Sequence, residues 1–298
     1  MMKQKNAGLS PARAGKISYT KPGKLSWAVK YGLLSLLLIV YIFPFFMVLI
    51  NAFKEKVDVI KNPLALIGER GFILSNFAEA VQKMNFFRAL GNSLLVTGVS
   101  VVLIVLFSAM AAYRIARSDW LACKIFFVLM IVSLAIPFQI LMIPLVSIYG
   151  SMLHILNHRA TLIFMHVGFG VSMSCFLFQG SIKSNIPLEL EESAAIDGCG
   201  SFRTFFGVVL PLLKPTIATT VIINTLNLWN DYLLPSLILG DSKLHTLPIA
   251  TRVFYGAFSS DLGLLLAALV LMILPILVLY LFLQKHIIEG VVAGAVKG

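Results

Sequence analysis

The carboxylates of one short polar stretch are the residues of this chain best suited to chemistry. Glu189, Glu191 and Glu192 lie within about one helical turn, and small residues follow at 193–195. Carboxylates accept charge-assisted hydrogen bonds, and small side chains let another surface approach closely. This spacing therefore favours non-covalent recognition of a second surface.

Two short helices are expected to position these groups. Pro187 is tolerated in a first helical turn, and the carboxylates after it suit the positive end of the helix dipole. Gly198 is expected just past the helix, in the left-handed conformation. Ser201 is expected to cap a second helix that reaches Phe206. The stretch 185–215 is thus predicted to be two helices with a glycine hinge, outside the bilayer. The alternative is an ordinary amphipathic helix at the membrane interface.

The composition of the chain is that of a membrane protein. Hydrophobic residues make up 59% of its 298 residues and charged residues 12%, whereas soluble domains are about half apolar and a quarter charged. The mean hydropathy is +0.92. The net charge of +11 does not indicate nucleic-acid binding, because seven Lys/Arg and no Asp/Glu precede Tyr31. Basic residues beside a span are a topology signal and can contact anionic membrane lipid.

Six apolar runs predict an all-α polytopic protein with six transmembrane helices. About 20 residues cross the hydrocarbon. The predicted spans are 31–50, 89–113, a third from near 125, 160–182, 216–235 and 262–284. A basic tail, 1–30, precedes this 31–284 domain, and a short tail, 285–298, follows it. Pro137 and Pro144 lie in the third span, where the alternatives are a pathway-facing stretch and a kink that lipid tolerates.

The distribution of basic residues orients these spans. The tail 1–30 has seven, the loop 114–124 three, the loop 183–214 three and the tail 285–298 two. An even number of spans puts all four segments on one side, which the positive-inside rule makes cytoplasmic. The loop 51–85 is the exception, with five basic residues nearly cancelled by four acidic ones. A bacterial cytoplasmic-membrane protein with both termini inside is predicted.

A polar stripe in the fifth span is the candidate solute pathway. Asn224, Asn227 and Asp231 share one helical face, and Trp229 and Asn230 lie beside them. Polar groups within a span are costly and rarely face lipid. The stripe therefore predicts either a wet cavity or a tight polar seam. A sugar would suit such aromatic and amide groups.

The remaining reactive side chains give weaker signals. His154 and His158 are four apart, but no third metal ligand lies beside them, so no metal site is predicted. His166, within a span, is expected to make a helix–helix hydrogen bond, and the alternative is contact with a ligand. The three cysteines, Cys123, Cys175 and Cys199, have no motif spacing and predict neither a disulfide framework nor a metal site.

Several classes of transport protein do not fit the sequence. No Gly-x-x-x-x-Gly-Lys-Ser/Thr loop for ATP occurs, and no potassium-channel filter occurs. A proton-coupled carrier would carry deep carboxylates or histidines, whereas only Asp231 and His166 are available. A secondary carrier that acts alone remains the alternative from a different class.

The polar stretch resembles the EAA loop of ABC-importer permeases. That pattern is Glu-Ala-Ala, three residues, Gly, nine residues, Ile-x-Leu-Pro, and this chain departs from it by Ser for Ala and Val for Ile. The matching residues are Glu192, Ser193, Ala194, Gly198, Val208, Leu210 and Pro211. The resemblance implies a cytoplasmic coupling helix that docks onto a separate ATPase subunit, with Asp197 helping Glu192 to position it.

Further motifs resemble the carbohydrate, maltose-type branch of these permeases. They are Leu228–Pro235, Thr246–Ile249 and the tail Glu289–Gly298, within a similarity that covers about Tyr31 to Gly298. In that branch the C-terminal tail reaches between the two ATPase subunits. The resemblance therefore implies coupling roles for Gly290, Gly294 and Lys297; the alternative is a disordered polar end.

The resemblance also implies the partners and the mechanism. A homologous second permease subunit, two ATPase subunits and an extracytoplasmic solute-binding protein are expected. This chain would bind no cofactor, since ATP and magnesium belong to the ATPase subunits. ATP closure would move the coupling helices and rock the permease pair around a sugar or oligosaccharide. An acidic saccharide or glycerol phosphate is the alternative solute.

Overall fold

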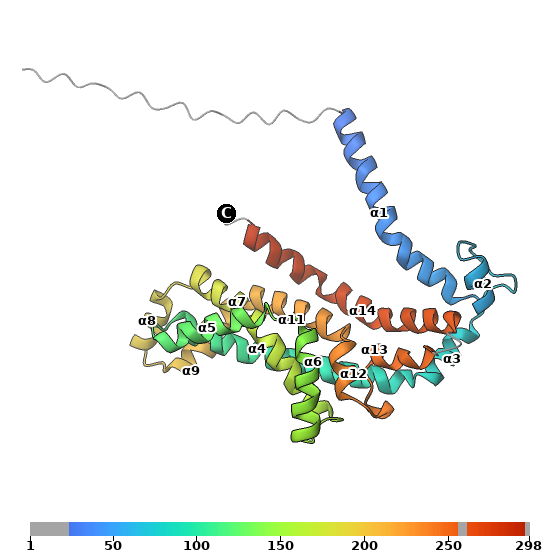
Figure 1. Ribbon diagram of the computed structural model, residues 1–298. Coiled ribbons are helices and arrows are strands. Elements are labelled where there is room, and N and C mark those ends of the chain that lie inside the picture. The colour runs from blue at the N-terminus through green and yellow to red at the C-terminus, as the bar shows by residue number, and fades with distance from the viewer. Residues whose placement is uncertain (1–23, 256–260, 296–298) are drawn as a thin grey trace, which may run out of the picture. The chain divides into compact units, whose positions relative to one another are not determined.

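The computed structural model describes the backbone of residues 24–255 and 261–295 and the side chains of 27–255 and 261–281 (Figure 1). Within these ranges every named element is helical, which confirms the all-α prediction. The α-helices are α1 Lys24–Ala52, α2 Lys56–Lys61, α3 Ser75–Lys83, α4 Phe86–Ala116, α5 Leu121–Ser133, α6 Phe138–Val146, α7 Arg159–Asn185, α8 Glu189–Ile196, α9 Ser201–Thr204, α10 Leu210–Leu212, α11 Lys214–Trp229, α12 Leu233–Ile238, α13 Leu247–Ala250 and α14 Leu262–Ala295. Two π-helices, η1 Ser147–Met152 and η2 Phe205–Val209, and two 3-10 helices, η3 Ser242–Leu244 and η4 Thr251–Phe254, complete the series.

The chain divides into two compact units within the last two turns of α1. The first is Met1–Phe46 and the second Met47–Gly298. In the first unit α1 already begins at Lys24, so the predicted tail 1–30 is too long; its residues 1–23 lie outside the described residues. Pro44 lies inside the helix.

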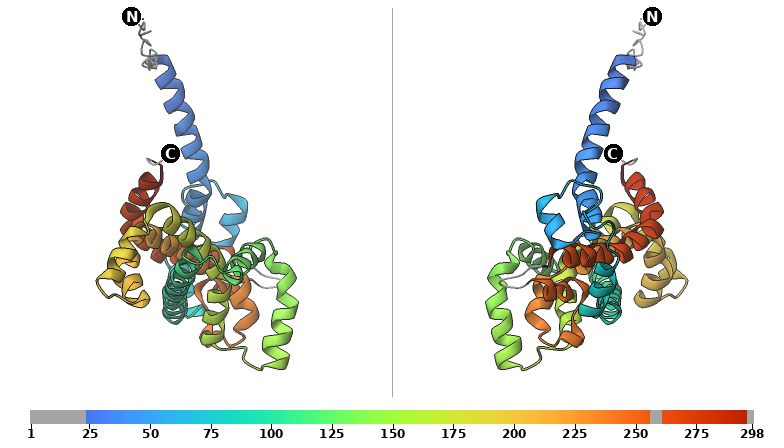
Figure 2. Two further views of the ribbon diagram at one scale, coloured as in Figure 1. Left: turned by 90° about the vertical axis from the view of Figure 1, so that its left-hand side faces the viewer. Right: turned by 90° about the vertical axis from the view of Figure 1, so that its right-hand side faces the viewer.

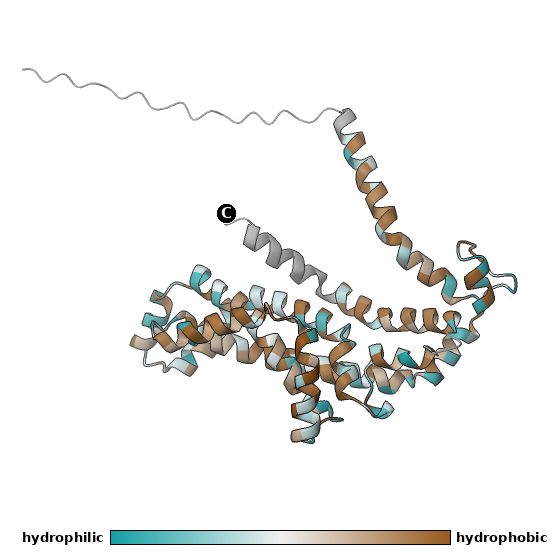
Figure 3. Cartoon of the chain, in the orientation of Figure 1, coloured by the Kyte–Doolittle hydropathy of each residue, from teal (hydrophilic) through white to brown (hydrophobic). Residues whose placement is uncertain are grey.

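Four helices are long and apolar enough to cross a membrane in one piece: α1, α4, α7 and α14. Their stretches with described side chains are mostly brown in the hydropathy colouring of Figure 3. Two bent pairs would bring the number of spans to six, if each pair crosses the membrane once. They are α5 with α6–η1, bent by 100°, and α9–α10 with α11, bent by 77°.

The third and fifth spans differ from their predictions. The third was expected as one kinked helix, but α5 ends at Ser133 and α6 begins after Pro137. Proline disfavours a helical residue before it and supplies no N–H, so the helix stops there. The fifth was expected to reach residue 235, but α11 ends at Trp229.

The core of the second unit is built around α4 and α7, which pack along each other. One apolar cluster joins these two helices to the α8–α11 connection through Ile186, Phe205 and Val209. Another joins them to α12 and the segment before α13. In both views of Figure 2, α6 and η1 (light green) stand apart from α4. The α4–α7 pair therefore fixes the position of the α8 region.

The C-terminal tail predicted at 285–298 is a helix over most of its length. The backbone of α14 continues to Ala295, so Gly290 and Gly294 lie on it. Lys297 lies outside the described residues. The alternative of a disordered polar end is wrong for 285–295.

Candidate functional site

The turn after α8 has the geometry that its sequence predicts. Gly198 has φ +79°, the left-handed region. Its N–H donates to Ala195 O at 3.0 Å, and the N–H of Cys199 donates to Ala194 O at 2.9 Å. These two bonds form a Schellman motif, which satisfies the last carbonyls of the helix. The chain therefore reverses sharply and leaves α8 as a short separate element.

The two faces of α8 have different surroundings. Glu191 and Ala194 are buried, whereas Glu192, Ser193 and Asp197 are exposed. The Ser193 hydroxyl donates to the backbone oxygen of Glu189 at 2.8 Å, so it is engaged locally. The carboxylates of Glu192 and Asp197 are left on the outer face, where a docking protein could reach them.

The buried face fastens α8 to the end of α4, a contact that the sequence reasoning missed. Glu191 accepts from Arg117 Nε at 2.8 Å and from the Tyr113 hydroxyl at 2.9 Å. Arg117 also donates to the backbone oxygen of Ile186 at 2.7 Å. Arg117 and Glu191 are 74 residues apart in the sequence. Nothing in the Glu-rich run distinguishes Glu191 from its neighbours. Movement of α8 is thereby linked to α4.

The second helix of this region differs in detail from the prediction. Gly200, not Ser201, is its N-cap, and no side chain caps it. It continues beyond Phe206 through a π-helix and α10, where Leu210 is half-buried and Pro211 exposed. Because a π-turn inserts one extra residue per turn, it changes which side chains point inward.

Two aromatic side chains of this segment differ in burial: one packs against α4 and the other is exposed. Phe205 is 3% exposed and packs on Tyr113 with ring centroids 5.3 Å apart. Phe202 is 72% exposed. Phe205 therefore anchors the loop to α4, while Phe202 remains available to a partner.

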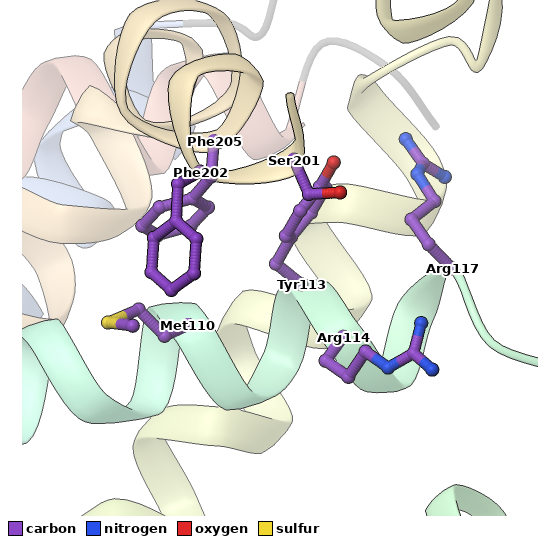
Figure 4. A pocket seen from close by; sticks show the side chains of 7 residues that line it. All are labelled: Met110, Tyr113, Arg114, Arg117, Ser201, Phe202 and Phe205. Atoms are coloured by element: carbon purple, nitrogen blue, oxygen red, sulfur yellow. The ribbon is translucent and has the colours of Figure 1, made fainter. Parts of the chain in front are cut away.

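A pocket of about 480 Å³ lies beside α8, between the last turns of α4 and the start of α9. Its lining side chains are Met110, Tyr113, Arg114, Arg117, Ser201, Phe202 and Phe205. In Figure 4 the apolar groups gather at one end and the two arginines at the other. Such a hollow could receive a side chain with an apolar body and an anionic tip.

Comparison with known proteins identifies the chain. Residues 104–292 match the family described as "Binding-protein-dependent transport system inner membrane component". The chain belongs to this family. The resemblance to ABC-importer permeases is thereby confirmed, and the protein is a multi-pass inner-membrane permease.

Two curated relatives and one solved structure illustrate the match. The probable starch degradation products transport system permease protein AmyC of Thermoanaerobacterium thermosulfurigenes is 38% identical over 87% of this chain and 93% of its own length. The melibiose/raffinose/stachyose import permease protein MelC of Bacillus subtilis is 36% identical over 86% and 91%. A crystal structure of a bacterial ABC transporter involved in the import of the acidic polysaccharide alginate gives a TM-score of 0.73 at 17% identity. It covers 90% of this chain and 98% of the matched one, and shows the fold.

The predicted pathway residues have different surroundings in the permease. Asn224 is 8% exposed, and its amide donates to Ser174 Oγ at 3.0 Å and to Thr220 O at 2.8 Å. This is the tight polar seam between α11 and α7, one of the two predicted alternatives. Asn227, by contrast, is exposed.

The residues that end α11 make hydrogen bonds within the chain, Trp229 in the interior and Asn230 at the surface. Trp229 is 3% exposed and its indole N–H donates to Met272 O at 3.4 Å. The Asn230 amide donates to Leu226 O at 2.8 Å. These bonds are internal to the chain and leave the predicted pathway role of both residues untested.

Asp231 and His166 form a buried contact. Asp231 Oδ2 lies 3.2 Å from His166 Nε2, and its Oδ1 accepts from the N–H of Leu234 at 3.3 Å. His166 is 2% exposed, and it makes a hydrogen bond as predicted, but to the segment between α11 and α12 and not to a helix. Asp231 therefore sets the break between α11 and α12.

The predicted histidine pair is not on a helix. His154 and His158 lie in the loop between η1 and α7, and His154 has φ +54°. Within the described part of the chain, no three His, Cys, Asp or Glu side chains are arranged to hold a metal. The three cysteines are free thiols.

Proposed function

We propose that this permease forms half of the pathway for a sugar or oligosaccharide and is driven by a separate ATPase that docks on α8. The transport functions for which AmyC and MelC are named, at 38% and 36% identity, support the sugar over glycerol phosphate or an acidic saccharide. Membership of the binding-protein-dependent family argues against a carrier that acts alone.

The outward carboxylates of α8 carry the proposal for coupling. Glu192 and Asp197 face away from the fold, and Glu191 joins the same helix to α4. A protein that engages the outer face would push on α4 through the buried pair. No ATP-binding loop is present in the sequence, so ATP and magnesium would belong to the partner. The chain itself would catalyse no reaction.

The proposed orientation puts α8 and both termini in the cytoplasm. It is supported by the basic residues of the segments 1–30, 114–124, 183–214 and 285–298. A phosphatase fused after Lys61 should be active outside the cell, and one fused after Gly198 should not. The reverse pattern would overturn the orientation.

A second permease, two ATPase subunits and a solute-binding protein would complete the transporter. Within its described residues α5 buries no side chain, which supports a partner permease against it. Gly290 and Gly294 on α14, together with Lys297 of the tail, would contact the ATPase pair, and the solute-binding protein would dock on the opposite side.

Copurification and uptake test this assignment together. The tagged permease, expressed with its neighbouring transport genes, should recover an ATPase subunit from detergent extracts. Glu192→Lys should leave recovery of the second permease unchanged but uncouple ATP hydrolysis from sugar uptake. Wild-type uptake by Glu192→Lys would remove α8 from the coupling path, and recovery of no ATPase would favour a lone carrier.

A further inference from the structure

The break between α5 and α6 exposes backbone at the middle of a predicted span. The helices meet at 100° across Leu134–Pro137, and the side chains of this break are exposed. The N–H groups of Leu134, Ala135 and Ile136 are bonded to carbonyls three residues back. In the described part of the chain no hydrogen bond is made to the carbonyl oxygens of these three residues.

Open carbonyls of this kind are not stable in hydrocarbon. Non-helical backbone at membrane depth is tolerated only where protein buries it or where it lines a water-filled cavity. This protein does not bury the break. Transporters commonly place solute sites at such interrupted helices, because the freed backbone groups can bind the solute. The break therefore needs either water or a partner subunit against it.

A cavity large enough to hold water lies against the break. It has a volume of about 580 Å³ and lies between the α5–α6 bend and α7. The hydroxyls of Ser133 and Ser172 meet across it at 3.1 Å. Tyr149 and Phe169 contribute aromatic walls, and Phe138 meets Phe169 edge-on at 5.5 Å.

This lining matches the chemistry of a polyhydroxylated solute. Ligand sites are mostly apolar with a few placed polar groups. Here the polar side chains are the hydroxyls of Ser133, Tyr149 and Ser172, the break contributes Leu134 and Ile136 to the lining, and the aromatic rings suit the C–H faces of a sugar. Gly168 widens the cavity, because a Cβ built there meets nothing within 4 Å.

We infer that the break Leu134–Pro137 and the α7 face from Gly168 to Ser172 line the aqueous solute pathway of this permease. The inference rests on the proposed transport function and adds the location of the pathway. It adds the α5–α6 bend to the predicted stripe 224–231, of which Asn224 and Trp229 are turned inward.

Thiol accessibility tests the inference without knowledge of the solute. Cysteines are introduced by Ser133→Cys or Ser172→Cys, with Val128→Cys as the control, after the three native cysteines are replaced. Val128 lies on α5, is 55% exposed and has an apolar surface around it. A sulfonate-bearing, membrane-impermeant methanethiosulfonate reagent is added to membrane fragments that hold the complete transporter and are open on both sides.

Labelling at positions 133 and 172 should be at least tenfold faster than at position 128. Equal rates at all three positions would overturn the inference, because the break would then be covered by lipid or by the partner permease. Uptake by the cysteine-free transporter tests the proposed function separately from this ratio.

A matched pair of glycines on α7 gives the second measurement. Gly168 lines the cavity, whereas Gly180 does not, and a Cβ at either meets nothing within 4 Å. In the Ser133→Cys protein, Gly168→Phe should slow labelling at least tenfold and Gly180→Phe less than twofold. Equal labelling in the two variants, at equal recovery of the complex, would show that this cavity is not the route to the break.

Discussion

The α8 turn and the segment 228–250 carry the two most specific polar motifs of the chain, and the fold uses them in opposite ways. In α8 the carboxylates of Glu192 and Asp197 face outward, and a single buried pair holds the helix in place. In the segment 228–250, Asp231 turns inward to His166. The first region displays its polar groups and the second uses them to fasten helices together.

The fastening of the segment 228–250 extends to the start of α4. The amide of Asn92 donates to the carbonyls of Lys243 and His245 at 3.0 and 2.9 Å. Ser93 Oγ accepts from the N–H of Leu247 at 2.8 Å. Loss of one of these internal hydrogen bonds should therefore lower the stability of the contact between two helices. Substitution on the outward face of α8 should instead reduce the coupling of ATP hydrolysis to uptake.

The ion pair between Glu191 of α8 and Arg117 at the end of α4 is here called the α8 tether. Its loss should have the largest effect on uptake. Arg117→Ala leaves the Glu191 carboxylate buried without its cation. Breaking a fully buried pair costs about 3–5 kcal/mol, and an exposed pair contributes less than about 1 kcal/mol. The side chains of Arg117 and Glu191 are 18% and 9% exposed, so we expect roughly 2 kcal/mol, between these values. Uptake should fall by at least about tenfold, with the permease pair still assembled.

A nearby exposed pair is the control for the tether. Lys124 and Asp119 lie 3.5 Å apart with side chains that are 60% and 107% exposed. Lys124→Ala should leave uptake within twofold of the parent. If Arg117→Ala behaves like Lys124→Ala, α8 does not act through α4.

The turn after α8 should be nearly as sensitive. Gly198→Val forces a β-branched residue into φ +79°, where L-residues are strained by about 1–2 kcal/mol. Uptake should fall about fivefold to tenfold, because the exposed face of α8 is misdirected. Gly200→Val is the matched control: both glycines have open space around a built Cβ, but Gly200 has φ −74°. Equal losses of uptake in the two variants would show that the left-handed backbone conformation at position 198 is not the cause.

The sequence was informative where the signal was local. The position of Gly198, the short α8 and the long spans followed from turn chemistry and apolar run length, which act over a few residues. The tether of Glu191 could not be foreseen, because its partner is 74 residues away. Pro137 was visible, but whether a proline kinks or breaks a span depends on what lies beside it. The continuous face expected over 224–231 was not foreseen to end early: α11 stops at Trp229, so Asp231 lies beyond the helix, and the pathway role of the stripe stays a prediction.

The inward pair should give a moderate effect on stability. Asp231→Ala removes the contact to His166 and the cap on the N–H of Leu234. Loss of such a cap typically costs about 1 kcal/mol, and an unsatisfied buried polar group about 1–3 kcal/mol. The midpoint of thermal unfolding in detergent should fall. Asp231→Asn keeps one oxygen that accepts from the N–H of Leu234 and places an amide N–H against His166 Nε2, so it should recover most of the loss. Equal loss by both variants would mean that the charge, not the hydrogen bonds, fastens this joint.

The smallest effect concerns the pH dependence of the segment 228–250. Burial lowers the pKa of His245 below 6.5, aided by Arg252 and opposed by the backbone contact with Leu239 and by Asp241. Between its folded and unfolded pKa values the unfolded chain binds more protons, so stability rises with pH through that window. Acidification from pH 7 to 5 should therefore lower the unfolding midpoint of the parent. In His245→Gln the unfolding midpoint should fall less between pH 7 and pH 5, because glutamine does not titrate. An unchanged dependence of the midpoint on pH would mean that His245 binds the same number of protons in the folded and unfolded states, and the stability of this segment would then not depend on the protonation of His245.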